Sequence, residues 1–360
     1  MKIGVNSRIY QNKNTGIPYY IQCLYSKLLE IDKENSYIFF QTELNKTLGD
    51  TLVQPVPSGY LGSLLFDLWY VHRLAHVNKV DIIHGPAHFL PFFKERHQKC
   101  IVTIHDLSLV RFPELTTWQF RAVFKYITGR SLRNATIVVT DSHSTKRDVV
   151  ELYGIDEAKV RVVHLGLNEV FLKESMPRRL VDKPYFFSLT THPQRKNILR
   201  VLEVFGEHLD DFGDLIYVVA GIISDDQLQV IKDQIAKYHL EDRVLLYGYA
   251  SEDQLISLYK YARFFIYPSF YEGFGFPIVE AMASGCPVIT SNTSSMPELM
   301  PDDTWLVDPY SKESIFNCTQ SMLNLNTAER TQLIAKNKSF AQQFNWNKSA
   351  AQMIEIFQGL

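Results

Sequence analysis

The sequence has 360 residues with a formal net charge of −2, and 46% of the residues are apolar and 13% aromatic. This composition excludes a disordered chain, and the near-neutral charge gives no indication of a nucleic-acid partner. The length fits two domains of ordinary size better than one core.

The distribution of charge and cysteine adds two expectations. Residues 1–170 carry 20 Lys/Arg against 16 Asp/Glu, a balance of +4, whereas residues 171–360 carry 17 against 23, a balance of −6. The 4 cysteines stand far apart without a C-x-x-C pair, which is typical of a reduced, cytosolic protein without a metal knot. The chain starts with a strand-forming run and contains no apolar stretch of membrane-spanning length, so we expect neither a signal peptide nor a span. We therefore predict a cytoplasmic protein.

The first half alternates strands with helices. A strand is predicted at residues 2–5, and Gly16 lies in the loop before a helix at about residues 17–30, whose apolar side chains follow the helical period. A glycine turn between strand and helix suits a phosphate, but with a single glycine a plain connection is the simpler interpretation. Further strands are predicted at residues 36–41, 80–84, 100–106, 135–140 and 160–164. This alternation predicts a parallel, doubly wound sheet.

Two amphipathic segments in this half allow two interpretations. Residues 118–133 alternate basic side chains with aromatic and aliphatic ones, and residues 61–77 form a second candidate. The pattern favours a helix that faces the core and exposes a basic face to solvent. The alternative is a surface that meets an anionic membrane or a lipid-diphosphate acceptor.

A second sheet follows residues 169–184, a polar, proline-containing stretch that we interpret as an interdomain linker. The turn after the first strand of this sheet contains Arg195 and Lys196 directly before a helix. Two cations at such a turn suit a diphosphate, the arginine as a fork and the lysine as a point charge, although as bare residues they also fit surface charges. The predicted elements here are strands at residues 185–189, 215–221 and 244–248 and a helix at residues 251–261.

Residues 263–291 combine a strand, a glycine-rich loop, a short helix at residues 277–284 and a further strand. The loop at residues 273–275 offers backbone N–H groups beside a helix N-terminus, an arrangement that suits an anion. Glu272 stands at the mouth of the loop, and Glu280 lies in the predicted first turn of the helix. Taken as isolated residues, they fit a solvated loop carboxylate and an acid placed favourably near a helix N-terminus.

The filled motif is more specific than its two glutamates. The run EGFGFPIVE at residues 272–280, followed by Ala281, Ala283, Gly285 and Pro287-Val288, resembles the E-x7-E signature of retaining glycosyltransferase family 4. Residues 193–197 (PQRKN) resemble the phosphate-binding turn of that family, and residues 244–249 resemble its base-binding strand. The resemblance covers nearly the whole chain and is densest from Tyr185 onward.

The resemblance implies the GT-B architecture, an α/β fold in which two Rossmann-like doubly wound domains face a central cleft. It assigns residues 1–168 to an acceptor-side N-terminal domain, residues 169–184 to the linker, and residues 185–345 to a domain that binds the nucleotide sugar. A C-terminal helix at residues 346–360 is expected to pack back onto the first domain.

The resemblance also implies roles for individual residues. His105 faces the donor sugar with Asp106 as its structural support, whereas His84 fits a hydrogen-bonded structural residue. The chain departs from the family at Thr190 and Thr191, where many members carry an arginine, and a differently arranged diphosphate clamp is the consequence to expect. The implied roles are catalytic for His105 and Glu272, ribose binding for Glu280, base binding for Tyr247 and Gly248, and diphosphate binding for Gly16, Arg195, Lys196, Gly273, Phe274 and Gly275.

The expected activity is transfer of a hexose to a glycan or lipid-linked acceptor in surface polysaccharide or glycan synthesis, with retention of configuration and GDP-mannose as the leading donor. No cofactor and no metal are expected, because the sequence lacks an Asp-x-Asp motif and a lysine–arginine clamp can replace a metal. The basic first half suggests peripheral contact with the inner face of a membrane. The competing hypotheses are a nucleotide-sugar epimerase or phosphorylase, a two-carboxylate hydrolase, and a non-catalytic nucleotide-sugar-binding protein.

Overall fold

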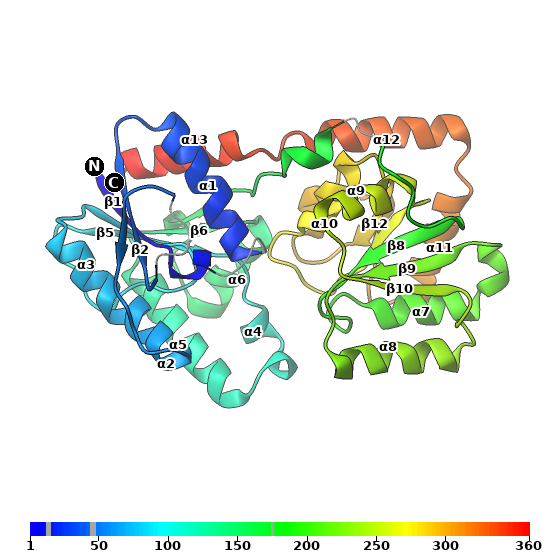
Figure 1. Ribbon diagram of the computed structural model, residues 1–360, viewed down its shortest axis with the longest axis horizontal. Coiled ribbons are helices and arrows are strands. Elements are labelled where there is room, and N and C mark those ends of the chain that lie inside the picture. Colours follow the sequence, from blue (N-terminus) through cyan, green and yellow to red (C-terminus); the bar gives the residue numbers. More distant parts are fainter. Residues whose placement is uncertain (12–15, 44–47, 174–175) are drawn as a thin grey trace. The chain divides into compact units, whose positions relative to one another are not determined.

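The protein is described by a computed structural model (Figure 1), which covers residues 1–11, 16–43, 48–173 and 176–360. The chain divides into two compact units. Met1–Gly166 together with Asn345–Leu360 form the first unit, and Leu167–Phe344 forms the second. Each unit contains a parallel sheet with helices on both faces, the doubly wound architecture that the alternation of strands and helices predicts.

Within the described residues, the first sheet has the strand order β3-β2-β1-β4-β5-β6-β7, and every neighbouring pair is parallel. Most strand residues are buried, because both faces of the sheet are covered. The strand order reverses at β1, which pairs with β2 on one side and β4 on the other. The strands are β1 (Lys2–Asn6), β2 (Ser36–Gln41), β3 (Thr51–Val53), β4 (Ile82–Gly85), β5 (Lys99–Ile104), β6 (Ile137–Thr140) and β7 (Val160–Val162).

The helices of the first unit cover its sheet from two sides. Val71, Leu132 and Val149 bring α3, α5 and α6 into one buried core with the sheet. On the other face, α1 packs against the C-terminal helix α13. The helices are α1 (Ile17–Ile31), α2 (Tyr60–Leu65), α3 (Val71–Val77), α4 (Ser108–Arg111), α5 (Trp118–Asn134), α6 (His143–Tyr153) and α13 (Trp346–Gln358), with a π-helical turn at Phe66–Tyr70 between α2 and α3.

Helix α5 divides its side chains between the core and solvent. Phe124 and Ile127 are buried, as the core-facing interpretation of this segment predicts, whereas Trp118 is 69% exposed and Tyr126 62% exposed. In the described ranges, no helix combines the length and the apolar character that are needed to cross a membrane.

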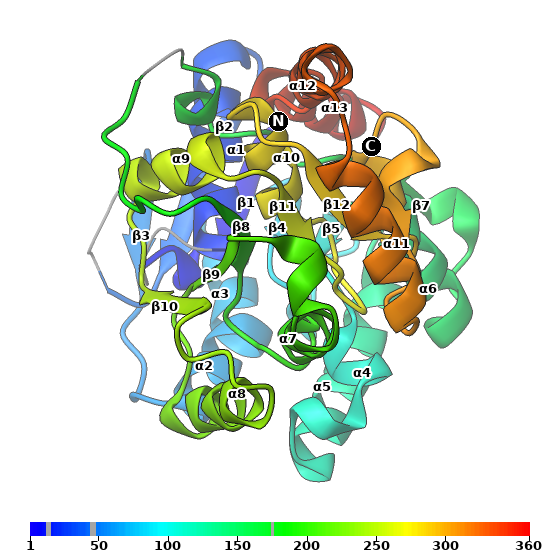
Figure 2. The same cartoon turned by 90° about the vertical axis from the view of Figure 1, so that its right-hand side faces the viewer.

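In the described part of the second unit, the strand order is β10-β9-β8-β11-β12-β13, again with every pair parallel. Figure 2 shows α9 and α10 on one side of this sheet and α7 and α8 on the other. The strands are β8 (Tyr185–Leu189), β9 (Ile216–Ala220), β10 (Val244–Gly248), β11 (Phe265–Tyr267), β12 (Val288–Ser291) and β13 (Leu306–Val307). The helices are α7 (Ile198–Glu207), α8 (Asp225–Lys237), α9 (Glu252–Tyr261), α10 (Phe276–Ala283), α11 (Lys312–Leu323) and α12 (Thr327–Ala341).

Aromatic rings dominate the core beneath one face of the second sheet. Phe186 of β8 stacks on Tyr217 of β9 with ring centroids 4.5 Å apart, and on Phe264 beside β11 with centroids 5.2 Å apart. Phe205 of α7 meets Phe186 edge-on at 5.1 Å. Such pairs add to the burial of their large apolar areas. They fix three adjacent strands, two of which, β8 and β11, lead into the loops of the candidate site.

The segment predicted to be an interdomain linker, residues 169–184, is instead part of the second unit. Phe171 lies in a short 3-10 helix and is buried. The carbonyl oxygen of Pro177 accepts a hydrogen bond from the hydroxyl of Tyr261 at 2.8 Å, and that of Arg178 accepts one from Ser257 at 2.8 Å. The prolines and polar residues of this segment therefore do not prevent its described part from packing on the second unit.

Candidate active site

Two loops that are far apart in the sequence meet at the carboxyl edge of the second sheet. One follows β8 and carries Arg195 and Lys196, and the other follows β11 and carries Glu272. Because β8 pairs directly with β11, with Phe187 opposite Phe265, the loops leave the sheet side by side. The strand order reverses at β8, and open parallel sheets bind their ligands beyond the carboxyl ends at such a point.

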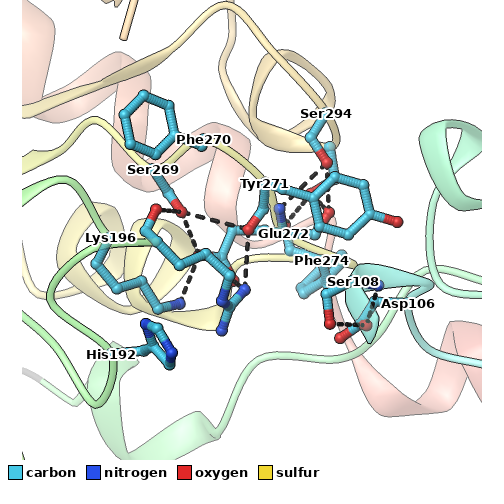
Figure 3. A network of polar contacts seen from close by, with 12 residues as sticks. Asp106, Ser108, His192, Lys196, Ser269, Phe270, Tyr271, Glu272, Phe274 and Ser294 are labelled. Carbon is cyan, nitrogen blue, oxygen red and sulfur yellow. Dashed lines mark hydrogen bonds and ion pairs between the residues drawn. The ribbon is translucent and has the colours of Figure 1, made fainter. Parts of the chain in front are cut away.

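The carboxylate of Glu272 forms the centre of a buried polar cluster (Figure 3). Its Oε1 accepts hydrogen bonds from the Lys196 ammonium at 2.5 Å and from the Ser269 hydroxyl at 2.6 Å. It also accepts one from the Tyr267 hydroxyl at 3.1 Å. Its Oε2 lies 3.2 Å from the guanidinium of Arg195. Glu272 is only 7% exposed, so it is not the solvated loop carboxylate that the isolated residue would suggest.

The electrostatics of this cluster favour the ionised form of Glu272. Burial alone would raise the pKa of Glu272, but the charges of Lys196 and Arg195 outweigh it and hold that pKa below its usual range. Burial and the nearby Glu272 charge raise the pKa of Tyr267 well above its usual value, so its hydroxyl stays protonated. That hydroxyl accepts a hydrogen bond from the Lys196 ammonium and donates one to Glu272.

The glycine-rich loop is fixed from the β12 side by two serines. The hydroxyl of Ser294 accepts a hydrogen bond from the Glu272 amide at 3.1 Å and lies 2.6 Å from the Glu272 carbonyl oxygen. Ser295 donates to the Phe274 carbonyl oxygen at 2.5 Å. Gly275 caps α10 with a φ of 120°, and a Cβ there would lie 3.0 Å from the side chain of Leu299. The loop conformation therefore requires a glycine at this position.

Glu280 lies deeper in its helix than predicted. The glycine cap lets α10 begin at Phe276, so Glu280 stands beyond the first turn, where the helix dipole acts weakly. The Tyr259 hydroxyl donates to its carboxylate at 3.3 Å. Burial raises the pKa of Glu280 to about 7, the Tyr259 bond lowers it, and the charge of Glu252 raises it. The residue can therefore change its charge near neutral pH.

The turn after β8 uses threonine where the family carries arginine. Thr190 is buried, its hydroxyl accepts a hydrogen bond from the His192 amide at 3.2 Å, and its own amide donates to Ala220 at 2.8 Å. These bonds shape the turn and join β8 to β9. Arg195 also donates to the Tyr271 carbonyl oxygen at 2.9 Å, which ties the turn to the glycine-rich loop.

Three other predicted residues lie outside this cluster. Tyr247 and Gly248 end β10, the edge strand of the second sheet, and the Gly248 carbonyl oxygen accepts a hydrogen bond from the Gly221 amide at 2.8 Å. Gly16 belongs to the first unit, where it caps α1 with a φ of 56° and is exposed. Its carbonyl oxygen accepts the first hydrogen bond of that helix, from Tyr20.

His105 follows β5 in the first unit and is held at both ring nitrogens. Its Nδ1 lies 2.7 Å from the Asp141 carboxylate, and its Nε2 lies 2.8 Å from the Pro86 carbonyl oxygen. Asp141 therefore supports His105, and the prediction that Asp106 does so is wrong. The Asp106 carboxylate accepts hydrogen bonds from the Ser108 amide and hydroxyl instead (Figure 3). A carboxylate next to an N-terminal turn is better placed to cap it than to reach the preceding side chain.

The protonation of the two histidines differs. Burial alone would lower the pKa of His105, but the charge and hydrogen bond of Asp141 outweigh it and raise that pKa above the usual value. Burial and the neighbouring His105 lower the pKa of His84 to about 3. His84 contacts the Tyr25 hydroxyl through Nδ1 and the Thr103 hydroxyl through Nε2, so its predicted structural role is confirmed.

Two family models match the chain. The model described as Glycosyltransferase Family 4 matches residues 41–170, and the model described as Glycosyl transferases group 1 matches residues 173–340. The chain belongs to glycosyltransferase family 4. The cluster around Glu272 lies within the second match.

The glycosyltransferase is similar to two curated bacterial proteins and to a solved structure. It is 28% identical over 289 residues to O-antigen chain mannosyltransferase B of Escherichia coli, covering 77% of this chain and 74% of that protein. It is 24% identical over 254 residues to O-antigen chain mannosyltransferase RfbU of Salmonella typhimurium, covering 69% and 68%. Sucrose-phosphate synthase from Thermosynechococcus elongatus matches with a TM-score of 0.78 at 19% identity, covering 100% of this chain and 98% of that chain. The fold is GT-B, as the sequence motifs implied.

Several residues of the glycosyltransferase site were not identified from the sequence. Ser269 and Tyr267 stand beside the glycine-rich loop, and only the folded loop turns their hydroxyls towards Glu272. Asp141 follows β6, which pairs with the strand before His105, so strand order is the signal that could have identified it.

Proposed function

We propose that this glycosyltransferase transfers a hexose from a nucleoside-diphosphate sugar to a hydroxyl group with retention of the anomeric configuration. The cluster of Glu272, Arg195 and Lys196 at the carboxyl edge of β8 and β11 is the observation that carries this proposal. It puts two cations within hydrogen-bond distance of one carboxylate, at the point where such sheets bind ligands.

The reaction needs positive charge for the departing diphosphate and negative charge for an oxocarbenium-like sugar. Arg195 offers a planar fork to phosphate oxygens and Lys196 a compact charge. The amides of residues 273–275 and the N-terminus of α10 add fixed dipoles of the same sign. Glu272 accepts hydrogen bonds from sugar hydroxyls and offsets the charge that develops on the ring.

The remaining contacts are proposed from the family resemblance. Glu280 accepts hydrogen bonds from the ribose hydroxyls, and the backbone at Tyr247 and Gly248 holds the base. His105 presents its face to the donor sugar, with its ring orientation set by Asp141. The family resemblance assigns Gly16 to diphosphate binding.

The names of the two curated relatives, both O-antigen chain mannosyltransferases, support mannosyl transfer in surface polysaccharide synthesis. The donor that we propose is GDP-mannose, and the acceptor is a growing glycan or a lipid-linked one. A thermal-shift panel of nucleoside diphosphates and their sugars tests the donor, because a ligand that binds the native state raises the melting temperature. Product analysis with and without an acceptor tests the reaction class. Sugar release or epimerisation without an acceptor would favour a hydrolase or an epimerase instead.

We also propose that the transfer requires no metal, because Arg195 and Lys196 supply the charge that a divalent cation would otherwise give the leaving group. Activity is expected to persist in excess EDTA. Complete loss on chelation, restored by Mg²⁺ or Mn²⁺, would contradict this assignment of the two cations.

The first unit exposes a surface that supports peripheral contact with an anionic membrane. Trp118 and Tyr126 on α5 are exposed beside Lys125, and the rings of Tyr60 on α2 and Phe120 on α5 contact each other at 5.3 Å. Exposed aromatic rings next to cations suit a membrane interface. We propose this surface as the contact that brings the enzyme to a lipid-linked acceptor at the cytoplasmic face.

A further inference from the structure

The two cations assigned to the donor diphosphate already have an anionic partner. Lys196 lies 2.5 Å and Arg195 lies 3.2 Å from the carboxylate of Glu272. We propose that Glu272 is the internal counter-ion of the diphosphate site, and that a binding diphosphate displaces its carboxylate from both cations. This inference rests on the proposed function and adds to it an exchange of anions.

The balance of charge in the cluster requires such an exchange. Two cations and one carboxylate leave a net charge of +1 in a site where all three side chains are mostly buried. A nucleoside diphosphate brings at least two negative charges to the same cations. If the carboxylate kept its place, it would face the incoming phosphate across a few ångströms of poorly solvated space, where like charges repel strongly.

The neutral members of the cluster allow the carboxylate to leave the cations without losing every partner. Ser269 and Tyr267 donate to Glu272 through hydroxyl groups that need no counter-charge. The Tyr267 hydroxyl also accepts from Lys196, whose ammonium lies 4.7 Å from the centre of the Tyr267 ring. The geometry thus assigns Tyr267 as a positioning residue, which keeps the ammonium in place while its anionic partner changes.

The exchange orders the events of donor binding. While it is paired with both cations, the Glu272 carboxylate is a weak acceptor for sugar hydroxyls. Once the diphosphate occupies Arg195 and Lys196, the carboxylate is released for the hexose that the same diphosphate carries. Part of the diphosphate's binding energy is spent on breaking the internal ion pairs, so the site holds the nucleotide less tightly than its cations alone would allow.

The test is Glu272→Gln, with GDP and UDP affinities measured by calorimetry. Removal of the competing anion is expected to tighten nucleoside-diphosphate binding about tenfold, which is the change in affinity that one charge-assisted hydrogen bond contributes. Transfer activity is expected to fall. Guanosine, which has no phosphate, is expected to bind both proteins equally. Glu203→Gln is the matched control, because Glu203 also pairs with a lysine in this unit, Lys312, but lies on α7 away from the turn.

A second variant keeps the test decisive if Glu272→Gln does not fold, since Lys196 would lose its buried partner. Glu272→Asp retains the charge but shortens the side chain, so weaker ion pairs and a smaller tightening are expected. For either variant, GDP should raise the melting temperature more than it does in the wild-type protein. If wild-type protein binds GDP or UDP and both variants bind it equally or more weakly, the exchange is overturned and the proposed function stands. If wild-type protein binds no nucleoside diphosphate, the proposed function itself fails.

Discussion

In both units the strand order reverses at the first strand of the sheet, β1 in one and β8 in the other, yet one polar network within the first sheet differs in kind from the cluster beyond the carboxyl edge of the second. Around β4 and β5, His84 contacts the hydroxyls of Tyr25 and Thr103, and Thr103 also contacts Tyr20 at 3.2 Å. Around β8 and β11, a carboxylate joins two cations. The network around His84 is built from neutral hydrogen bonds, whereas the cluster around Glu272 is held by ion pairs.

The two networks respond differently to a ligand. Burial and the neighbouring His105 lower the pKa of His84 to about 3, so this network is uncharged at neutral pH and its hydrogen bonds serve the fold. In the second unit, the cations around Glu272 keep their charge for any anion that replaces the carboxylate. The comparison shows that strand topology fixes where polar groups gather, whereas residue type decides whether they can be exchanged for a ligand.

The largest effect is expected for Lys196→Met, which breaks the ion cluster. Losing one member of a buried ion pair should lower the free energy of unfolding by about 3 kcal/mol. Losing a charge aimed at the leaving diphosphate should lower kcat/KM by at least about a hundredfold. Transfer assays and thermal melts measure both, with Lys312→Met as the control because Lys312 pairs with Glu203 and Glu207 at the surface. If the Lys196 variant bound the donor normally, the ion cluster would have no role in ligand binding, and this difference between the two units would disappear.

The next effect concerns Glu280, which shares the second unit but stands outside the ion cluster. Glu280→Gln should raise the donor KM by about ten- to a hundredfold if one charge-assisted bond to the ribose is lost. The folded-state pKa of about 7 lies above the usual 4.5, so this group contributes stability below pH 4.5 that is lost as the pH rises through about 7. The variant cannot ionise, and it should therefore melt higher than the wild-type protein at pH 8. Unchanged donor affinity would remove the ribose assignment.

A smaller effect is expected for Asp141→Asn, which tests whether His105 and Asp141 form a charged pair beside the neutral network of the first unit. Asp141 raises the pKa of His105, so this histidine contributes stability that is complete below about pH 6.5 and is lost as the pH rises through the folded-state pKa. The variant should lose about 2 kcal/mol of stability at pH 6 and less at pH 8. NMR titration of His105 checks the cause directly. The same replacement at Asp106, whose charge also raises the pKa of His105 but less than Asp141 does, should shift the titration of His105 less.

Much of the fold could be predicted because long apolar runs signal buried strands. The strands at residues 36–41, 185–189 and 244–248 have the predicted bounds. The strands Thr51–Val53 and Leu306–Val307 were not predicted. A segment of two or three residues is too short to show a hydrophobic period, and it becomes a strand only because it pairs with an adjacent strand.

The site was predicted only in part for a related reason. Sequence motifs identified Arg195, Lys196 and Glu272, but their direct pairing depends on the adjacency of β8 and β11, which lie about 80 residues apart. The Asp141 support of His105 likewise depends on the pairing of β5 with β6. The local sequence determines which polar and charged side chains are present, and the order of the strands in the sheet determines which of these side chains contact one another.

The smallest effects are expected at the aromatic and basic surface of α5. This surface belongs to the first unit, whereas the ion cluster around Glu272 belongs to the second. Arg130 is excluded from this test because it donates to the Phe92 carbonyl oxygen at 3.2 Å and lies over the Phe92 ring at 4.8 Å, so its role is structural. Arg121, Lys125 and Arg133 remain as candidate membrane contacts, together with exposed Trp118.

Wild-type protein should sediment with anionic liposomes at low salt and be released at high salt, because each cation near such a surface contributes about 1 kcal/mol. Replacing Lys125 by glutamine should therefore weaken binding about fivefold, and Trp118→Ala should weaken it by a salt-independent factor because an inserted ring binds through burial. Lys232→Gln with Lys237→Gln is the matched control, since both lysines are exposed on α8 of the second unit. Binding that depends on these α8 lysines as strongly as on α5 would move the membrane contact to the other unit, and no binding at low salt would leave α5 an ordinary solvated helix.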